Sequence, residues 1–300
     1  MSSLSYAAPT SVDDAVKLLA GASGLAKVLS GGTDLLVQLR SGRLKPDLIV
    51  DTKKIPGVIG IREENGGFVI GAATPGAVVE AHAGLTAAWP GLVEALDLIG
   101  STQVQGRCSL AGNLCNASPA ADSVPALYAA GAVAVIVGSK GRREVPVEQV
   151  PTAPGRTSLA KDEFILEFKL PPRPARSSDA YLRFIPRTEM DIAVVGCGVS
   201  VTLDEAGVCT AARVSLGAVS PTVILVPAAA EALIGHTLDA DTLAKLDAAA
   251  RAAAKPISDK RGTIEYRTKI AGVLARRAAA IAFDRAQGVS AGTKTNGKAH

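Results

Sequence analysis

The sequence predicts an α+β fold, in which a larger domain of mixed strands and helices precedes a smaller one with an antiparallel sheet packed against helices. The chain has 300 residues, more than the roughly 100–200 of an ordinary single domain. Strand-like apolar runs alternate with helical patterns in the first half, and a strand–turn–strand pattern precedes helices in the last third. Between them, segment 171–180 contains three prolines, two arginines and two serines, which is typical of a linker. We therefore expect domains at 1–175 and 178–287.

The composition excludes several classes of protein. Hydrophobic residues make up 48% of the chain and aromatic residues only 3%, so Ala, Val, Leu and Ile must fill the interior. The net charge of +4 is spread without an arginine-rich block, which argues against nucleic acid as a partner. No apolar run approaches the roughly 20 residues of a membrane span, and the N-terminal segment lacks the pattern of a signal peptide. We expect a cytoplasmic protein without a membrane span.

The four cysteines do not form a recognisable metal or redox motif. Cys108, Cys115, Cys197 and Cys209 have spacings that fit neither a zinc ribbon nor a redox dithiol. They are expected to be reduced, packed thiols, as is usual for a cytoplasmic protein, and no metal site is predicted.

The first elements are a helix, a strand, a glycine turn and a second helix. Ser11 precedes two acidic residues and an apolar helical pattern, so it is expected to cap a helix over 12–20. The run at 26–29 predicts a short strand that ends at Gly31 and Gly32, after which 33–42 resumes a helical pattern. A second buried strand is predicted within 46–58.

The middle of the chain continues this alternation and then departs from it. Segment 67–82 predicts a strand, a turn at Pro75 and Gly76, and a helix. Segment 99–138 contains a long stretch of small and polar residues before a short helix and a β-branched strand. Structureless stretches beyond about 12–15 residues in compact domains are usually functional, so this one is a candidate site.

The last third predicts a hairpin followed by helices. Segments 191–203 and 208–220 flank the turn sequence Asp-Glu-Ala-Gly, which indicates an antiparallel hairpin. The Gly-x-Gly at 196–198 lies inside the first of these strands and is assigned to close packing. Asp239 or Asp241 is expected to cap an alanine-rich helix.

The final helix is predicted to begin near Thr263, and the residues after it, 288–300, are predicted to be disordered. One apolar face of this helix is expected to carry Tyr266, Ile270, Val273, Leu274, Ala278 and Ile281.

Two turns of small residues are candidate anion sites. After the strand at 26–29, free backbone N–H groups at "SGGTD" (30–34) could hold a phosphate, and glycine lets the anion approach the backbone. Taken alone, this turn is more simply explained as a tight connection capped by Thr33 or Asp34. The second turn, "SLAGNLCNASPAAD" (109–122), could hold a second phosphate, with Asp122 accepting from a ribose hydroxyl, or could be a surface loop.

Five segments in order resemble one family. They are "VLSGGTDLL", "VIGAATP", "CSLAGNLCNASPAAD", "FILEFKLP" and "YLRFIPRTEMDIAVVG". Together they resemble the FAD-binding medium subunit of molybdenum hydroxylases, the group of xanthine dehydrogenase and aerobic carbon monoxide dehydrogenase. The resemblance extends to about Ala286. It implies an N-terminal two-lobed FAD-binding domain of the PCMH type, with lobes at about 1–55 and 56–175, and a C-terminal domain of the carbon monoxide dehydrogenase flavoprotein type.

The resemblance also implies the residues of the cofactor site. Both turns would hold the FAD pyrophosphate, Ile99 and Ile165 would flank the flavin, Asp122 would lie near the nucleotide moiety, and Arg183 would lie near the ring. The implied turn residues are Val28, Leu29, Ser30, Gly31, Gly32, Thr33, Asp34 and Leu35, followed by Ser109, Leu110, Ala111, Gly112 and Asn113. An alternative reading of Arg183 is an ordinary ion-pair residue at a domain interface.

The implied function is electron transfer inside a larger oxidoreductase. A large molybdopterin subunit and a small subunit with two two-iron, two-sulfur clusters are the implied partners, in a dimer of heterotrimers. Electrons would pass from the clusters through noncovalent FAD to NAD, a quinone or oxygen. The second turn carries Ala111 where the family usually has glycine. That departure leaves a flavin-free scaffold subunit open as an alternative, and a free-standing flavin reductase is another.

Overall fold

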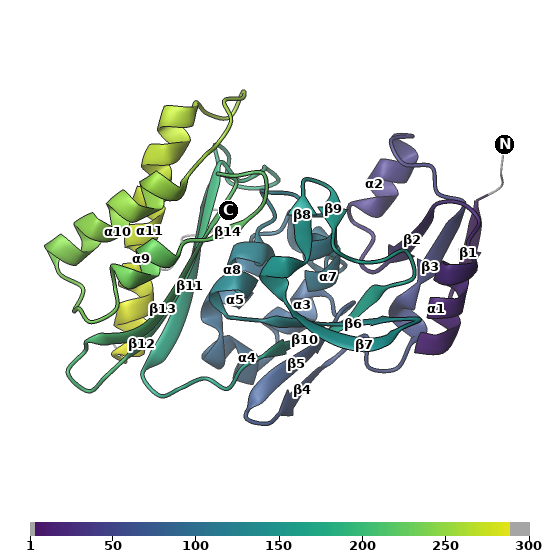
Figure 1. Ribbon diagram of the computed structural model, residues 1–300, viewed down its shortest axis with the longest axis horizontal. Coiled ribbons are helices and arrows are strands. Elements are labelled where there is room, and N and C mark those ends of the chain that lie inside the picture. The colour runs from purple at the N-terminus through teal and green to yellow at the C-terminus, as the bar shows by residue number, and fades with distance from the viewer. Residues whose placement is uncertain (1–3, 289–300) are drawn as a thin grey trace.

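The structure, a computed structural model, describes residues 4–288 and contains three main sheets with helices around them (Figure 1). The N-terminal sheet has three parallel strands, the middle sheet has five antiparallel strands, and the C-terminal sheet has four. This mixed arrangement confirms the predicted α+β fold class. Apart from Gly288, the predicted disordered tail lies outside the described residues. No helix within residues 4–288 is both long and apolar enough to cross a bilayer.

Two strands of the N-terminal sheet, β2 and β3, form where the sequence predicts them, whereas the strand at 5–7 was not predicted. Its elements are β1 (Ser5–Ala7), α1 (Val12–Gly21), β2 (Ala26–Leu29), α2 (Leu35–Arg40), β3 (Leu48–Asp51) and the 3-10 turn η1 (Thr52–Lys54). The Ser11 side chain accepts from the amide of Asp14 at 3.1 Å, so the expected cap is confirmed. The strand order is β1-β3-β2, which leaves β2 at an edge. The glycine turn therefore leaves the sheet from an edge strand.

The middle sheet combines strands that lie far apart in the chain. Its order is β4-β5-β10-β6-β7, with bounds β4 (Ile61–Glu64), β5 (Gly67–Gly71), β6 (Val133–Gly138), β7 (Gly141–Pro146) and β10 (Phe164–Leu170). A 3-10 turn, η2 (Val147–Gln149), and a small hairpin of β8 (Pro151–Ala153) and β9 (Arg156–Thr157) lie between β7 and β10. The central strand β10 is thus the last of the five strands in the sequence.

Six short helices accompany the middle sheet. They are α3 (Gly76–Glu80), α4 (Ala83–Ala88), α5 (Pro90–Asp97), α6 (Thr102–Gln105), α7 (Leu110–Cys115) and α8 (Ser123–Ala129). Helices α6 and α7 lie inside the stretch expected to be a long irregular loop. Ser109 explains why α7 begins where it does, because its side chain accepts from the amide of Gly112 at 3.2 Å.

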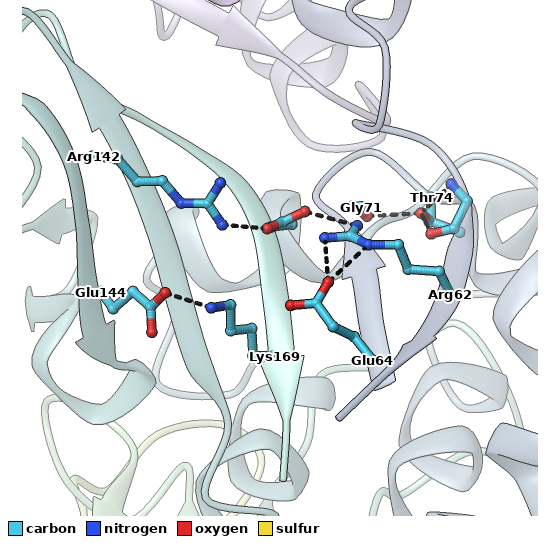
Figure 2. A network of polar contacts seen from close by, with 9 residues as sticks. Arg62, Glu64, Gly71, Thr74, Arg142, Glu144 and Lys169 are labelled. Carbon is cyan, nitrogen blue, oxygen red and sulfur yellow. Dashed lines mark hydrogen bonds and ion pairs between the residues drawn. The ribbon is translucent and has the colours of Figure 1, made fainter. Parts of the chain in front are cut away.

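An ionic ladder crosses one face of the middle sheet (Figure 2). Glu167 on β10 has a side chain only 5% exposed, and it is ion-paired with Arg62 of β4 at 2.9 Å and with Arg142 of β7 at 2.6 Å. Lys169 and Glu144 form a further pair on the same face. Because both arginines are nearly half exposed, each pair adds little net stability, and the ladder links the edge strands β4 and β7 to β10.

The C-terminal sheet is antiparallel and is covered on one side by helices α10 and α11 (Figure 1). Its elements are β11 (Ser177–Phe184), β12 (Val195–Leu203), β13 (Cys209–Gly217), β14 (Ile224–Leu225), α9 (Pro227–Glu231), α10 (Ala240–Ala253) and α11 (Ile264–Ala286). The hairpin of β12 and β13 confirms the expected one. Asp239, rather than Asp241, caps α10, and Thr263 caps α11.

The buried face of α11 differs from the expected one. Leu274 and Ala278 are buried as predicted, but Tyr266 is 40% exposed. The buried stripe is made largely of alanines, such as Ala271, Ala275 and Ala282, because small residues let the helix lie close to β11 and β12.

A second close packing joins α8 to the other face of the C-terminal sheet. A Cβ atom on Gly198 would lie 2.6 Å from the carbonyl oxygen of Pro125, so β12 needs glycine there. Ser215 of β13 donates to the same carbonyl at 2.6 Å. This contact confirms the assignment of the Gly-x-Gly sequence to packing.

Candidate functional site

A cavity of about 510 Å³ lies between the N-terminal and middle sheets. Its walls come from the turn between β2 and α2, from the start of α7, and from the segment 157–165 that leads into β10. Helices α2 and α7 both contribute residues to its lining. A volume of this size is in the range of sites for drug-sized ligands and cofactors.

The two predicted turns touch each other at the cavity. A Cβ atom on Gly31 would lie 2.0 Å from the carbonyl oxygen of Arg107, so the two backbones are in contact with no room for a side chain. The hydroxyls of Ser30 and Ser109 are 2.6 Å apart, and the amide of Gly76 donates to the carbonyl of Cys108 at 2.9 Å. Gly32 and Gly112 line the same cavity. The turns therefore converge as the sequence predicts.

Several backbone amides at these turns have no protein acceptor. Among residues 4–288, no carbonyl or side chain accepts from the amides of Gly31, Gly32 or Thr33, nor from those of Leu110 or Ala111. Leu110 and Ala111 begin α7, and the first amides of any helix lack a partner within it. The free amides of Gly31, Gly32 and Thr33 precede α2 and belong to residues that line the same cavity, and such a group suits an anionic ligand. Because α2 and α7 have six residues each, these local N–H groups rather than long helix dipoles would provide the attraction.

Other parts of the cavity wall are apolar. Ala72, Ile99, Phe164 and Ile165 line it together with Leu159, which suits a flat aromatic group. Both predicted isoleucines thus lie in the wall.

Burial shifts the pKa of three acidic groups in the wall, whereas the hydrogen bond from Arg143 lowers the pKa of Glu163, which also lines the cavity. Burial raises the pKa of Asp34, and it raises the pKa of Cys108 to about 11 and that of Cys115 to about 12. Both thiols are therefore protonated and uncharged at neutral pH. They add no negative charge that would repel an anion.

The structure brings most predicted site residues to this cavity but not all of them. The lining includes Val28, Ser30, Gly31, Gly32, Thr33, Asp34, Leu35, Ile99, Ser109, Ala111, Gly112, Asn113 and Ile165. Leu29, Leu110, Asp122 and Arg183 are not part of that lining. Leu110 is 1% exposed and packs in the core, while the side chain of Leu29 lies next to Gly32.

Asp122, directly before α8, and Arg183 on β11 of the C-terminal sheet pair with each other. Arg183 of β11 donates to Asp122 at 2.8 Å, and the Tyr181 hydroxyl donates to the same carboxylate at 3.0 Å. Burial raises the pKa of Asp122 to about 6, although Arg183 and Tyr181 oppose the shift. This arrangement corresponds to the ion-pair alternative for Arg183. Asp122 precedes Ser123, which donates to the Asn113 side chain at 2.7 Å and so links the pair to the cavity wall.

This buried carboxylate predicts a pH-dependent stability. Between its ordinary pKa of 3.8 and about 6, folded protein keeps a proton on Asp122 that unfolded protein releases, so raising the pH across that window destabilises the wild type. Asp122→Asn has no such proton. The stability advantage of the wild type over Asp122→Asn should therefore shrink by about 2 kcal/mol from pH 4 to pH 6 in denaturant titrations. Tyr181→Phe removes a hydrogen bond that lowers the pKa of Asp122, so the destabilisation of this variant by rising pH should continue above pH 6. A constant difference for Asp122→Asn would contradict the assignment.

Sequence reasoning missed part of the wall. Cys108 and Cys115 are packed as expected, and both also line the cavity. Gln38 and Asn116 also line it and join across it through a side-chain hydrogen bond of 3.2 Å. Lys161 follows β9 and donates to the carbonyl of Ala22. For the wall formed by residues 157–165, the only sequence signal was the segment "FILEFKLP", because isolated polar residues such as Lys161 form no motif.

Comparison with known proteins agrees with this architecture. Residues 2–173 match the family described as the FAD binding domain in molybdopterin dehydrogenase, and residues 180–282 match the carbon monoxide dehydrogenase flavoprotein C-terminal domain. The carbon monoxide dehydrogenase medium chain of Afipia carboxidovorans is 32% identical over 285 residues, covering 95% of this chain and 98% of that protein. The alpha subunit of the 6-hydroxypseudooxynicotine dehydrogenase complex of Paenarthrobacter nicotinovorans is 30% identical over 285 residues, covering 95% and 96%.

A solved structure is similar to this chain over nearly the full length of both. It is the carbon monoxide dehydrogenase of Hydrogenophaga pseudoflava that lacks the Mo-pyranopterin moiety of its cofactor, and one of its chains superposes with a TM-score of 0.90 at 33% identity, covering 94% of this chain and 98% of that one. These comparisons confirm the predicted resemblance. The two family matches together span both halves of the chain, and the relatives agree with it over nearly its full length. The chain with these two converging turns belongs to the FAD-binding subunit family of the molybdopterin dehydrogenases.

Proposed function

We propose that this chain is the FAD-carrying electron-transfer subunit of a molybdenum hydroxylase complex. The observation that supports this most is the cavity in which two turns present free backbone amides beside apolar walls. When bound there, FAD would accept single electrons from two-iron, two-sulfur clusters of a partner subunit and pass a pair to an external acceptor. The substrate site would lie in a partner.

The residues of the cavity fit noncovalent FAD. The amides of Gly31, Gly32 and Thr33 would hold one phosphate and that of Ala111 would contact the other, because these residues line the cavity and no protein group within the described chain accepts from their amides. The isoleucines and Phe164 would exclude water from the ring.

We propose that two of the predicted site residues, Asp122 and Arg183, act on the cofactor site indirectly. Asp122 and Arg183, already paired outside the lining, would support the wall through Ser123 and Asn113 rather than contact the cofactor. Their mutual pairing and the hydrogen bond to Asn113 support this role.

The proposed setting is a cytoplasmic assembly. The partners would be a large molybdopterin subunit and a small iron–sulfur subunit, arranged as a dimer of heterotrimers. Within the chain, we propose a cofactor-binding domain at 1–175, with lobes at about 1–55 and 56–175, and a C-terminal domain at 178–287. The relatives compared act in complexes whose names state different substrates, carbon monoxide and 6-hydroxypseudooxynicotine, so no substrate is assigned.

The direct test is to purify the chain and identify its bound cofactor. The visible spectrum should show an oxidised flavin, and heat should release FAD rather than FMN, with about one equivalent per chain or one after reconstitution. Co-purification of a molybdenum-containing subunit and an iron–sulfur subunit would support the assembly. Colourless protein that cannot be reconstituted with FAD would refute the proposal.

The scaffold alternative rests on Ala111, and the structure suggests a test of it. Ala111 lines the cavity, but it is only 7% exposed and packs within the core of buried residues, so little of its surface is open to a ligand. Ala111→Gly should therefore change FAD affinity by less than about threefold, while it lowers the free energy of unfolding by about 1 kcal/mol. Fluorescence titration with FAD and denaturant unfolding would measure the two effects. A large gain in affinity would show instead that the methyl group obstructs the site.

A further inference from the structure

Lys53 contacts the first turn from outside the cavity. It lies in η1, directly after β3, and its ammonium group donates to the carbonyl of Ser30 at 3.1 Å. The same ammonium group is 2.8 Å from Asp51, whose side chain is only 10% exposed. Its neighbour Thr52 lines the cavity but Lys53 does not. Lys53 is therefore placed to act on the turn rather than on a ligand.

Asp51 and Tyr6 hold Lys53 in this position. The Tyr6 hydroxyl on β1 donates to Asp51 at 2.7 Å, and the amide of Lys53 donates to the other carboxylate oxygen at 3.0 Å. Burial alone would raise the pKa of Asp51, but the hydrogen bonds from Lys53 and Tyr6 lower it overall. The carboxylate is thus ionised at neutral pH, and a chain of three side chains connects β1 to the carbonyl of Ser30.

The position of that carbonyl determines where the next amide points. In a trans peptide unit the C=O of one residue and the N–H of the next point in opposite directions. When Lys53 holds the Ser30 carbonyl, the N–H of Gly31 must point away from Lys53. The two following residues, Gly31 and Gly32, have little steric restriction on their backbone angles, so an external anchor reduces the conformations open to the turn. At the other side of the turn, the Gly32 carbonyl accepts from the amide of Leu36 at 3.0 Å.

We propose that Lys53 is a positioning residue, which orients the amides of the first turn toward the FAD phosphates without touching the cofactor. The inference rests on the proposed function, because it assigns a role in binding that same cofactor. Tyr6 and Asp51 extend this role to the outermost strand of the N-terminal sheet. The three side chains form what we call the turn anchor.

The first experiment compares two neighbouring lysines. Lys53→Met keeps the length of the side chain but removes its donor, and Lys54→Met makes the same change of charge one residue away, at an exposed position. FAD affinity of the full chain, measured by fluorescence titration, should fall about tenfold or more for Lys53→Met and stay within about twofold for Lys54→Met. Equal affinity of Lys53→Met and the wild type would overturn the proposal. Failure of the wild type itself to bind FAD would instead refute the proposed function.

The second experiment separates anchoring from simple charge attraction. Asp51→Asn removes a negative charge near the turn, so electrostatics alone predicts tighter binding of the anionic cofactor. Anchoring predicts the reverse, because Lys53 loses its ion pair and releases the Ser30 carbonyl. Weaker FAD binding by Asp51→Asn would support the proposal, and tighter binding would overturn it.

A third measurement excludes a general loss of stability. Thermal unfolding and amide hydrogen exchange should be recorded on flavin-free Lys53→Met, Asp51→Asn and Tyr6→Phe. We expect faster amide exchange at residues 31–33 in the variants than in the wild type. We also expect no correlation between the unfolding temperatures of the variants and their FAD affinities. Affinity that follows the unfolding temperature across all three variants, with no local change in exchange, would assign the turn anchor to general stability and overturn the proposal.

Discussion

Gly31→Ala is expected to abolish most FAD binding. The added methyl group would lie 2.0 Å from the carbonyl oxygen of Arg107 and 3.1 Å from the Cα of Cys108, and both are backbone atoms that cannot rotate away. The two turns must separate, and the distance between their free amides then no longer matches two linked phosphates. Overpacking of this kind costs about 1–3 kcal/mol, which corresponds to a roughly ten- to hundredfold loss of affinity. Flavin content per chain after purification, and FAD titration of the stripped protein, would measure it.

Two other glycines provide graded controls. At Gly32 an added Cβ would lie 3.0 Å from a leucine methyl group that can move, although its φ of +84° makes alanine strained there. At Gly21, the last residue of α1, no atom lies within 4 Å of the added Cβ. Flavin content should therefore decrease in the order Gly21→Ala, Gly32→Ala, Gly31→Ala. Wild-type content in Gly31→Ala would mean that the two turns do not meet as described.

Gly198→Val is expected to be the most destabilising single change at the interface between the middle and C-terminal parts. Its Cβ would lie 2.6 Å from the Pro125 carbonyl and 2.9 Å from the Ser215 hydroxyl, which itself donates to Pro125. The valine must push α8 away from the sheet and break that hydrogen bond. We expect a loss of about 3 kcal/mol in the free energy of unfolding, measured by denaturant titration.

Ser200→Val is the matched control for this change. Ser200 lies two residues further along β12, is half-buried and already carries a Cβ, so a β-branched residue suits this strand position. Its effect should stay within about 0.5 kcal/mol. A similar loss in both variants would show that the strand, rather than the contact with α8, is sensitive to valine.

Local signals explain most of the elements that the sequence predicted. Caps such as Ser11 and Thr263, and the turn between β12 and β13, depend on residues within three or four positions of each other. The order of the middle sheet depends on distant pairing, because β10 inserts between β5 and β6. No local pattern specifies that insertion. The face of α11 was also mispredicted, since alanine gives a weak periodic signal even when it packs most closely.

The residues of the candidate site also fall into two groups, those that local sequence signals predict and those that depend on long-range contacts. The two small-residue turns were visible because glycine and serine have distinctive backbone roles. The wall that contains Leu159 and Lys161 was not visible, since it becomes a wall only when β10 pairs in the centre of its sheet. Arg183 could be given two roles from the sequence, and the structure shows its ion pair with Asp122. Which role a charged residue has depends on the partner that folding brings to it.

The position of Tyr6 has a practical consequence for preparing this protein. Tyr6 is the middle residue of β1, an edge strand of three residues, and its hydroxyl is the outer end of the turn anchor. An affinity tag fused ahead of this strand would be close to Tyr6, which is linked through Asp51 and Lys53 to the Ser30 carbonyl. The yield of yellow protein should therefore be compared between preparations tagged at opposite ends before any loss of colour is attributed to a substitution.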